Sequence, residues 1–237
     1  MAAVTGRTAE LAANLDAVED RLTAACTAAD RRRGDITLVA VSKTFPTADV
    51  EALAALGLKD FGENRDQEAR VKAAAVPSVR WHFVGRLQRN KCRSVATYAD
   101  AVHSVDRVEV ADALADGAAR SGRLIDVLVQ VSLDDDADLD RDRGGALPHE
   151  VPAIAAACAR APHLRLSGVM AVAPLSADPD DAFGRLAEVA ARLRSDYPRA
   201  DAISAGMSGD LESALRHGST HVRVGTALLG GRRLPDG

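Results

Sequence analysis

A lysine lies where the first strongly apolar segment of this chain ends. The segment 36–42 is rich in β-branched residues, which is typical of a buried strand, and Lys43 follows it directly. A lysine at the rim of a core is partly desolvated, which favours its neutral amine, and a neutral amine can form a Schiff base with an aldehyde. The alternative is a lysine at a strand end whose amine simply reaches water.

Two short segments near the C-terminus combine glycine with a hydroxyl residue. Ser208 lies within the segment 206–209, and Gly225 is followed by Thr226. Hydroxyls and exposed backbone N–H groups bind phosphate, and barrel folds often bind phosphate after their last two strands. Ordinary turn chemistry, with Ser208 as a helix N-cap, explains each segment alone. Together with Lys43, they indicate a ligand with a phosphate and an aldehyde, such as pyridoxal 5′-phosphate (PLP).

An arginine precedes the second of these segments. Arg223 is two residues before Gly225, so both lie on the same side of a strand. A guanidinium at this position could face the pyridine nitrogen of PLP, keep it unprotonated, and so weaken the ring as an electron sink. A salt bridge inside the core explains Arg223 equally well.

Other polar residues near expected strand ends have simple structural interpretations. His82 and His103 are more typical of core or rim histidines than of catalytic bases. Glu63 can pair with Arg65 or with Lys91.

The arrangement of apolar segments predicts the fold that must position these residues. Short apolar segments alternate with alanine-rich stretches of helical spacing, at about 24 residues per unit, which is the size of a βα repeat. Eight units predict an α/β protein with a single (β/α)8 TIM barrel. An open doubly wound sheet is the alternative, but it more often has a glycine-rich fingerprint after its first strand. The expected strands are 36–42, 58–61, 81–84, 101–105, 125–132, 164–172, 201–205 and 221–224.

The helical stretches carry their own end signals. Roughly the first thirty residues predict an additional amphipathic helix, which we expect to end at 31–34 with Gly34 as the C-cap. The sequence 106–109 resembles a capping box that opens another helix. Gly57 and Gly117 are placed where helices would stop.

Composition excludes several classes of protein. The chain has 237 residues, 47% hydrophobic and 27% charged, and its formal net charge of −4 gives no global attraction to nucleic acid. The three cysteines are too far apart for a zinc site and odd in number for a disulfide framework, so we expect reduced thiols and a cytoplasmic protein. No apolar stretch is long enough to span a membrane, and the acidic N-terminal region argues against a signal peptide.

The ordered motifs resemble those of the pyridoxal phosphate homeostasis proteins. The resemblance runs from about 36 to 230, and several of its blocks are specific. The motifs that carry it are VSKT at 41–44, FGEN at 61–64, WHFVG at 81–85, HSVDR at 103–107, GVMA at 168–171, GMS at 206–208 and GSTHVRVGT at 218–226.

This resemblance implies a single domain, residues 1–237, that is similar to the N-terminal barrel of bacterial alanine racemase. It implies PLP bound as a Schiff base on Lys43, with no metal and no catalytic residue. The other cofactor-binding residues that it implies are Asn64 beside the ring, His82 and Met207 lining the pocket, Ser208, Gly225 and Thr226 at the phosphate, and Arg223 at the pyridine nitrogen.

The resemblance also implies a role in vitamin B6 balance rather than turnover. A PLP-dependent amino-acid racemase is the main alternative, but its second base would be a tyrosine from a second domain. Both tyrosines of this chain, Tyr98 and Tyr197, fall on expected helices. A Schiff-base aldolase without cofactor is a third possibility. PLP-dependent apoenzymes are possible acceptors, no nucleic acid or membrane is expected as a partner, and we expect a monomer.

Three features depart from the family pattern. Arg86 stands where many members have proline, and Ala205 where many have methionine. The charged segment 134–143, expected to be a solvated loop, is longer than usual. Of these, Arg86 could change the charge at the mouth of the pocket.

Overall fold

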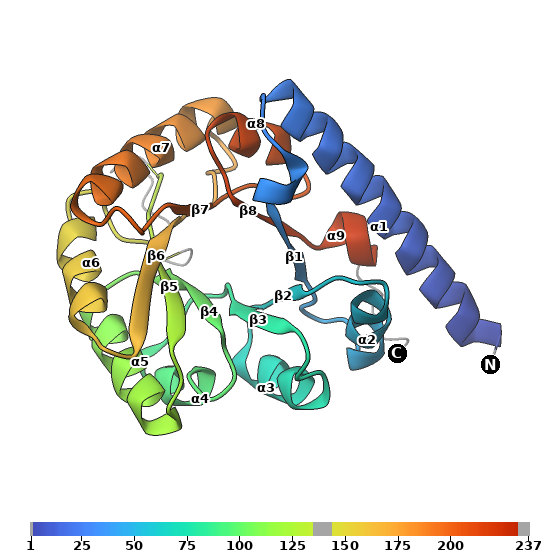
Figure 1. Cartoon of the computed structure of the whole chain (residues 1–237), viewed down its shortest axis with the longest axis horizontal. Helices are drawn as coiled ribbons and strands as arrows, with labels where there is room; N and C mark the ends of the chain where they lie inside the picture. The colour runs from blue at the N-terminus through green and yellow to red at the C-terminus, as the bar shows by residue number, and fades with distance from the viewer. Residues whose placement is uncertain (1, 135–143, 232–237) are drawn as a thin grey trace.

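Eight parallel strands close into a barrel in the computed structural model, which describes residues 2–134 and 144–231 (Figure 1). Consecutive strands are paired, and β8 pairs with β1, so the sheet has no edge. This confirms the predicted (β/α)8 barrel and excludes the open sheet. Most of the charged segment 134–143 lies outside the described residues. The strands are β1 (Thr37–Val41), β2 (Asp60–Glu63), β3 (Arg80–Phe83), β4 (Ala101–Val105), β5 (Ile125–Gln130), β6 (Leu164–Met170), β7 (Ala202–Ser204) and β8 (His221–Val224).

Helices surround the barrel and connect its strands (Figure 1). None of those within residues 2–134 and 144–231 is both long and apolar enough to cross a bilayer. The helices are α1 (Ala2–Ala28), α2 (Thr47–Ala55), α3 (Asp66–Ala75), α4 (Cys92–Val95), α5 (Val108–Ser121), α6 (Val151–Arg160), α7 (Pro179–Asp196), α8 (Leu211–Arg216) and α9 (Thr226–Leu229), with short 3₁₀ turns η1 (Arg33–Asp35) and η2 (Arg89–Lys91).

The apolar core lies between the strands and the helices, whereas part of the barrel interior is polar. Leu114 of α5 and Leu186 of α7 are fully buried against the outer face of the barrel, as their helical spacing predicts. Inside the barrel, His103, Ser204 and Arg223 are all buried as well. A (β/α)8 barrel is usually filled by branched apolar side chains, so these polar residues need partners within the barrel.

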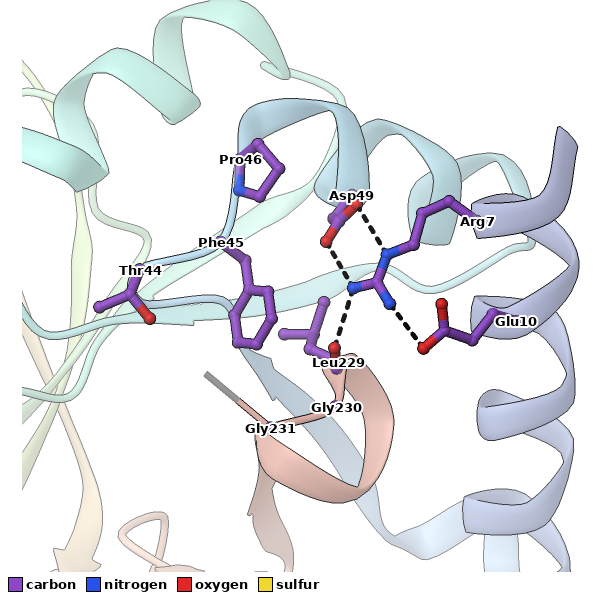
Figure 2. Close-up of a pocket in the computed structure, with 9 residues that line it drawn as sticks. All are labelled: Arg7, Glu10, Thr44, Phe45, Pro46, Asp49, Leu229, Gly230 and Gly231. Carbon is purple, nitrogen blue, oxygen red and sulfur yellow. Dashed lines mark hydrogen bonds and ion pairs between the residues drawn. The ribbon is translucent and has the colours of Figure 1, made fainter. Parts of the chain in front are cut away.

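The additional N-terminal helix packs along one side of the barrel, against α2, α8 and α9 (Figure 1). Leu11 and Leu22 of this helix are fully buried, which confirms its amphipathic pattern. Arg7 of α1 binds both carboxylate oxygens of Asp49 and also donates to the carbonyl of Leu229, beside a hollow of about 320 Å³ (Figure 2). These contacts fix α1 to the first and last parts of the barrel.

Three of the predicted helix ends are wrong. Helix α1 ends at Ala28, before 31–34, because Asp30 turns the chain with φ of +54°. The capping box at 106–109 does not form, since Arg107 is the N-cap of α5 and no side chain caps that helix. Gly57 does follow α2, with φ of +100°, but Gly117 lies within α5.

Candidate functional site

Four neighbouring strands bring their C-terminal ends together on one side of the barrel mouth. Because β8 pairs with both β7 and β1, and β1 pairs with β2, the loops after these strands are adjacent. Lys43 follows β1 and Asn64 follows β2, while the segment 206–209 follows β7. Arg223 lies within β8, paired with Val39 of β1. The structure thus brings together most of the residues that the sequence singled out.

Lys43 lies in a tight turn directly after β1. The N–H of Phe45 donates to the carbonyl of Ser42 at 3.1 Å, and the N–H of Thr44 donates to a carboxylate oxygen of Glu68 at 2.9 Å. The side chain of Lys43 is partly buried, and its amine has no hydrogen-bond or ion-pair partner among residues 2–134 and 144–231. An unpaired amine on a fixed turn is available to react with a ligand.

A buried ion pair between Lys72 and Glu63 stabilises the turn that contains Lys43. The amine of Lys72 in α3 donates to Glu63 Oε1 at 2.6 Å and to the carbonyl of Ser42 at 2.7 Å. The hydroxyl of Ser42 donates to the same Glu63 oxygen at 2.7 Å. Glu63 and Lys72 are 1% and 5% exposed. The expectation that Glu63 pairs with Arg65 or Lys91 is therefore wrong, because Lys72 of the surrounding helix α3 pairs with it instead.

Arg223 points toward the ends of β6 and β7. Its Nη1 donates to the hydroxyl of Ser204 at 2.6 Å, and its Nη2 donates to the carbonyl of Ala171 at 2.8 Å. No carboxylate pairs with Arg223 among the described residues, so the alternative of an interior salt bridge is wrong for this part of the chain. Burial lowers the pKa of Arg223 to about 10, so the guanidinium stays charged at neutral pH.

The loop after β7 is anchored to the N-terminal helix. Arg21 of α1 donates to the carbonyl of Ser208 at 2.7 Å and also pairs with Glu212 of α8. The alternative of Ser208 as an N-cap is wrong, because Asp210 is the N-cap of α8, and its carboxylate accepts from the N–H of Met207 at 2.6 Å. Nothing in the described residues binds the hydroxyl of Ser208, and Met207 is exposed.

The last strand ends at the second predicted phosphate segment. Gly225 is the N-cap of α9, and Thr226 begins that helix with an exposed side chain. A Cβ added to Gly225 would be 3.3 Å from the carbonyl oxygen of Val41, so this segment lies directly beside the end of β1. The two glycine segments and Lys43 therefore share one side of the barrel mouth.

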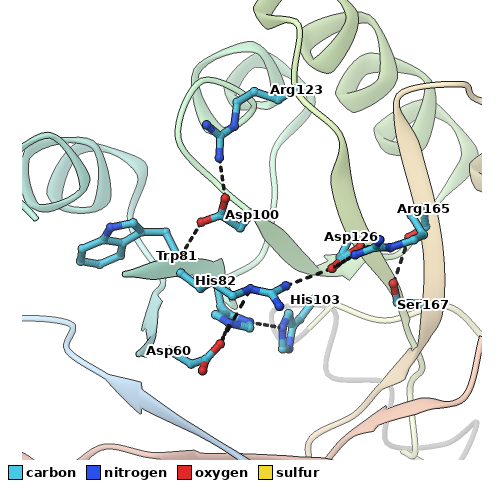
Figure 3. Close-up of polar contacts among 10 residues, drawn as sticks. Asp60, Trp81, His82, Asp100, His103, Arg123, Asp126, Arg165 and Ser167 are labelled. Carbon is cyan, nitrogen blue, oxygen red and sulfur yellow. Dashed lines mark hydrogen bonds and ion pairs between the residues drawn. The ribbon is translucent and has the colours of Figure 1, made fainter. Parts of the chain in front are cut away.

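His82 occupies a different place from the other candidates. It is buried inside the barrel, and its Nδ1 and Nε2 bond to His103 and Asp60, both at 2.9 Å (Figure 3). Asp60 begins β2, so this contact reaches toward the N-terminal end of the barrel. The structure does not bring His82 to the mouth with Lys43.

Several polar groups at the mouth lack a partner within the described residues. Asn64 Oδ1 is buried without a hydrogen bond. Together with the unpaired amine of Lys43 and the guanidinium of Arg223, it fits a ligand that carries an electrophilic carbon, a polar ring and an anionic group.

Sequence reasoning missed two groups that support this site. Ser204 and Lys72 hold Arg223 and the Lys43 turn, respectively. The only available signal for Ser204 was a polar residue within an apolar strand. Lys72 gave no signal, because it resembles any charged residue on a helix.

Comparison with known proteins gives concordant relatives. A profile of the alanine racemase N-terminal domain family matches residues 13–233. A pyridoxal phosphate homeostasis protein of Mycobacterium bovis is 44% identical, with 99% of this chain and 97% of that protein covered. A protein of the same name from Escherichia coli strain K12 is 37% identical, with 94% and 97% covered.

Solved structures give the same result. The structure of PipY from Synechococcus elongatus with PLP bound is 32% identical and superimposes with a TM-score of 0.80, covering 93% of this chain and all of that one. An alanine racemase of Streptomyces coelicolor has a TM-score of 0.74 at 21% identity. The match covers 95% of this chain and 59% of the racemase. At this low identity the likeness shows a shared fold and nothing more.

Proposed function

Because this chain belongs to the family of pyridoxal phosphate homeostasis proteins, which have the alanine racemase N-terminal fold, we propose that it binds PLP and acts in intracellular vitamin B6 homeostasis. One observation carries the proposal: the unpaired amine of Lys43, directly after β1, and the buried guanidinium of Arg223, within β8, belong to adjacent strands of the barrel. A relative that is 32% identical has been solved with PLP bound.

Each residue at the mouth has a distinct task in this proposal. The amine of Lys43 binds the aldehyde of PLP as a Schiff base. Ser208, Gly225 and Thr226 bind the phosphate with hydroxyl and backbone N–H groups. Asn64, with its unpartnered oxygen, lies beside the ring.

Met207 and His82 have weaker support in this proposal. Met207 is exposed next to Ser208 and can line the pocket. His82 belongs to the site only indirectly, because both its ring nitrogens are already bonded inside the barrel.

We also propose that the protein has little catalytic turnover. PLP supplies an electron sink for chemistry at the carbon next to an amino group. Arg223, which stays charged, would hold the pyridine nitrogen unprotonated and so weaken that sink. A racemase needs a second base, but the hydroxyl of Tyr98 already donates to Asp66 at 3.4 Å, and Tyr197 precedes β7 and so lies toward the opposite end of the barrel from Lys43.

The remaining parts of the proposal concern the state of the protein. We propose one PLP-binding domain over residues 1–237, a monomer in the cytoplasm, and PLP-dependent apoenzymes as acceptors. The closed barrel and the packing of α1 across its first and last elements support a single domain.

An absorption spectrum with borohydride reduction tests the proposal. The purified protein with added PLP should show the visible band of a Schiff base, and reduction should fix a pyridoxyl group on the peptide that contains Lys43. Lys43→Ala should lose the reducible adduct. Lys59→Ala, a lysine at the opposite end of the barrel, is the matched control and should keep it. A stable adduct in Lys43→Ala, or a wild-type protein that takes up no PLP, would refute the assignment.

Racemisation assays separate the two functional hypotheses. Racemisation of alanine or serine at ordinary enzymatic rates, about 1 to 10³ per second, would contradict the homeostasis role without turnover.

A further inference from the structure

A continuous line of hydrogen bonds crosses the interior of the barrel from one end to the other. Asp60 Oδ1 lies 2.9 Å from His82 Nε2, and His82 Nδ1 lies 2.9 Å from His103 Nε2 (Figure 3). His103 Nδ1 lies 2.9 Å from Ser204 Oγ, which in turn accepts from Arg223 at 2.6 Å. The line therefore joins a carboxylate at the start of β2 to the guanidinium at the mouth.

The proton positions along this line follow from its two ends. A guanidinium can only donate, so Ser204 Oγ accepts from Arg223. The remaining proton of Ser204 has one partner among the described residues, which is His103 Nδ1. His103 Nδ1 is then an acceptor, so a neutral His103 ring carries its proton on Nε2.

The same logic continues to the carboxylate. His103 Nε2 donates to His82 Nδ1, so a neutral His82 also carries its proton on Nε2 and donates it to Asp60. This gives each bond one donor and one acceptor. The opposite direction would leave the buried hydroxyl proton of Ser204 without an acceptor and place an unprotonated His82 nitrogen against a carboxylate, unless His82 carried two protons.

We propose that Asp60, His82, His103 and Ser204 form a one-way hydrogen-bond relay, with both histidines neutral and protonated on Nε2, and that Ser204 is the positioning residue through which the relay orients Arg223. This inference rests on the proposed function only for its consequence at PLP. Ser204 and the carbonyl of Ala171 bind the two terminal nitrogens of Arg223 and so fix the orientation in which the guanidinium faces the pyridine nitrogen.

Burial and charge support a neutral His103. His103 is fully buried, and burial, followed by the neighbouring His82 and His221, holds the pKa of His103 well below its usual value. The third histidine, His221, bonds instead to the hydroxyl of Thr220 at 2.8 Å and stays outside the relay. No group of His, Cys, Asp or Glu side chains in the described part of the chain could hold a metal ion, so the paired rings are not metal ligands there.

Nitrogen NMR of the cofactor-free protein tests the relay directly. In protein labelled with ¹⁵N-histidine at pH 7, the spectra should show a protonated, pyrrole-type Nε2 and an unprotonated, pyridine-type Nδ1 for both His82 and His103. Two protonated nitrogens on His82, or a proton on Nδ1 of either ring, would overturn the assignment. The measurement does not depend on PLP, so it stands even if the proposed function fails.

The positioning role of Ser204 is tested with bound PLP. Ser204→Ala should weaken PLP affinity by about tenfold and shift the absorption band of the bound cofactor, since a hydrogen bond to a charged group is lost. Ser204→Thr, which keeps the hydroxyl, should restore both. Ser219→Ala is the control, because Ser219 is equally buried but its hydroxyl donates to backbone carbonyls outside the relay.

Two outcomes separate the hypotheses. Equal spectra and affinities for Ser204→Ala and Ser219→Ala would refute the positioning role. A wild-type protein that binds no PLP would refute the proposed function, and the NMR result would then decide the relay alone.

Discussion

Replacement of Lys72 by methionine removes one partner of the buried pair beneath the Lys43 turn. Methionine matches the length of the lysine stem but leaves the Glu63 carboxylate, 1% exposed, with the Ser42 hydroxyl as its one hydrogen-bond donor in the part of the chain that the structure describes. Glu63 Oε2 already lacks a partner among the described residues. Breaking a buried ion pair from one side costs about 3–5 kcal/mol, so we expect the free energy of unfolding to fall by that amount.

Urea unfolding followed by circular dichroism measures this loss. With a slope of about 3 kcal/mol per M, the expected loss lowers the midpoint by roughly 1–1.7 M. A second readout reports the turn itself. Lys72 also donates to the carbonyl of Ser42, next to Lys43. Without urea, where both proteins are folded, the variant should therefore form the borohydride-stable adduct on Lys43 more slowly than the wild type.

Two controls make this prediction specific. Glu63→Gln in the Lys72→Met background removes the uncompensated charge and should recover most of the lost stability. Arg192→Met breaks an exposed ion pair with Glu188 and should change stability by less than about 0.5 kcal/mol. A loss below about 1 kcal/mol for Lys72→Met, or no recovery in the double variant, would refute the reasoning.

Three further predictions follow from single contacts. Ser208→Ala should weaken PLP binding by about 1–3 kcal/mol if its hydroxyl binds phosphate, whereas Ser195→Ala on an exposed helix face should not; equal affinities by fluorescence titration would contradict this. Gly85→Ala places a Cβ 2.3 Å from the carbonyl oxygen of Asn64, so it should lower the melting temperature and PLP affinity together, and an unchanged melting temperature would count against the close approach. Burial first, and then a nearby histidine, lowers the pKa of His221 to about 4, so only the unfolded chain binds this proton between about pH 6.5 and 4. The free energy of unfolding should therefore fall as pH drops through that window, by up to about 3 kcal/mol for this group. His221→Gln should make this fall smaller when it is measured by urea unfolding at each pH. The same pH dependence in the variant and the wild type would contradict this.

The strand order could be predicted from sequence because apolar runs and helical spacing alternate so regularly. The fourth and eighth strands lie where the apolar runs 101–105 and 221–224 placed them. The second strand was predicted at 58–61 but is Asp60–Glu63. Its last residues, Gly62 and Glu63, are unlike a buried strand by type, and Glu63 is buried there only because Lys72 of the next helix reaches it.

Site residues could be predicted where the local sequence pattern marks them. They could not be predicted where two residues from distant segments bind each other. Lys43 stands out because it ends an apolar run, and Arg223 because it interrupts one. By contrast, His103 and Ser204 are 101 residues apart in the chain yet share a hydrogen bond. No local pattern encodes such a pair, because it arises only once the barrel has closed.

Gly117 illustrates the same limit for helix ends. A glycine with free φ often stops a helix, and the prediction treated Gly117 in this way. In the structure a Cβ on Gly117 would lie 2.9 Å from the side chain of Ala96 and 3.1 Å from Arg93 Cα, so glycine is needed for α4 to pack closely against α5. The helix instead ends at Gly122, with φ of +66°. Both glycines look alike in sequence, and only the neighbouring helix distinguishes a packing glycine from a terminating one. We therefore expect Gly117→Ala to destabilise the protein through a clash, despite alanine's higher helix propensity.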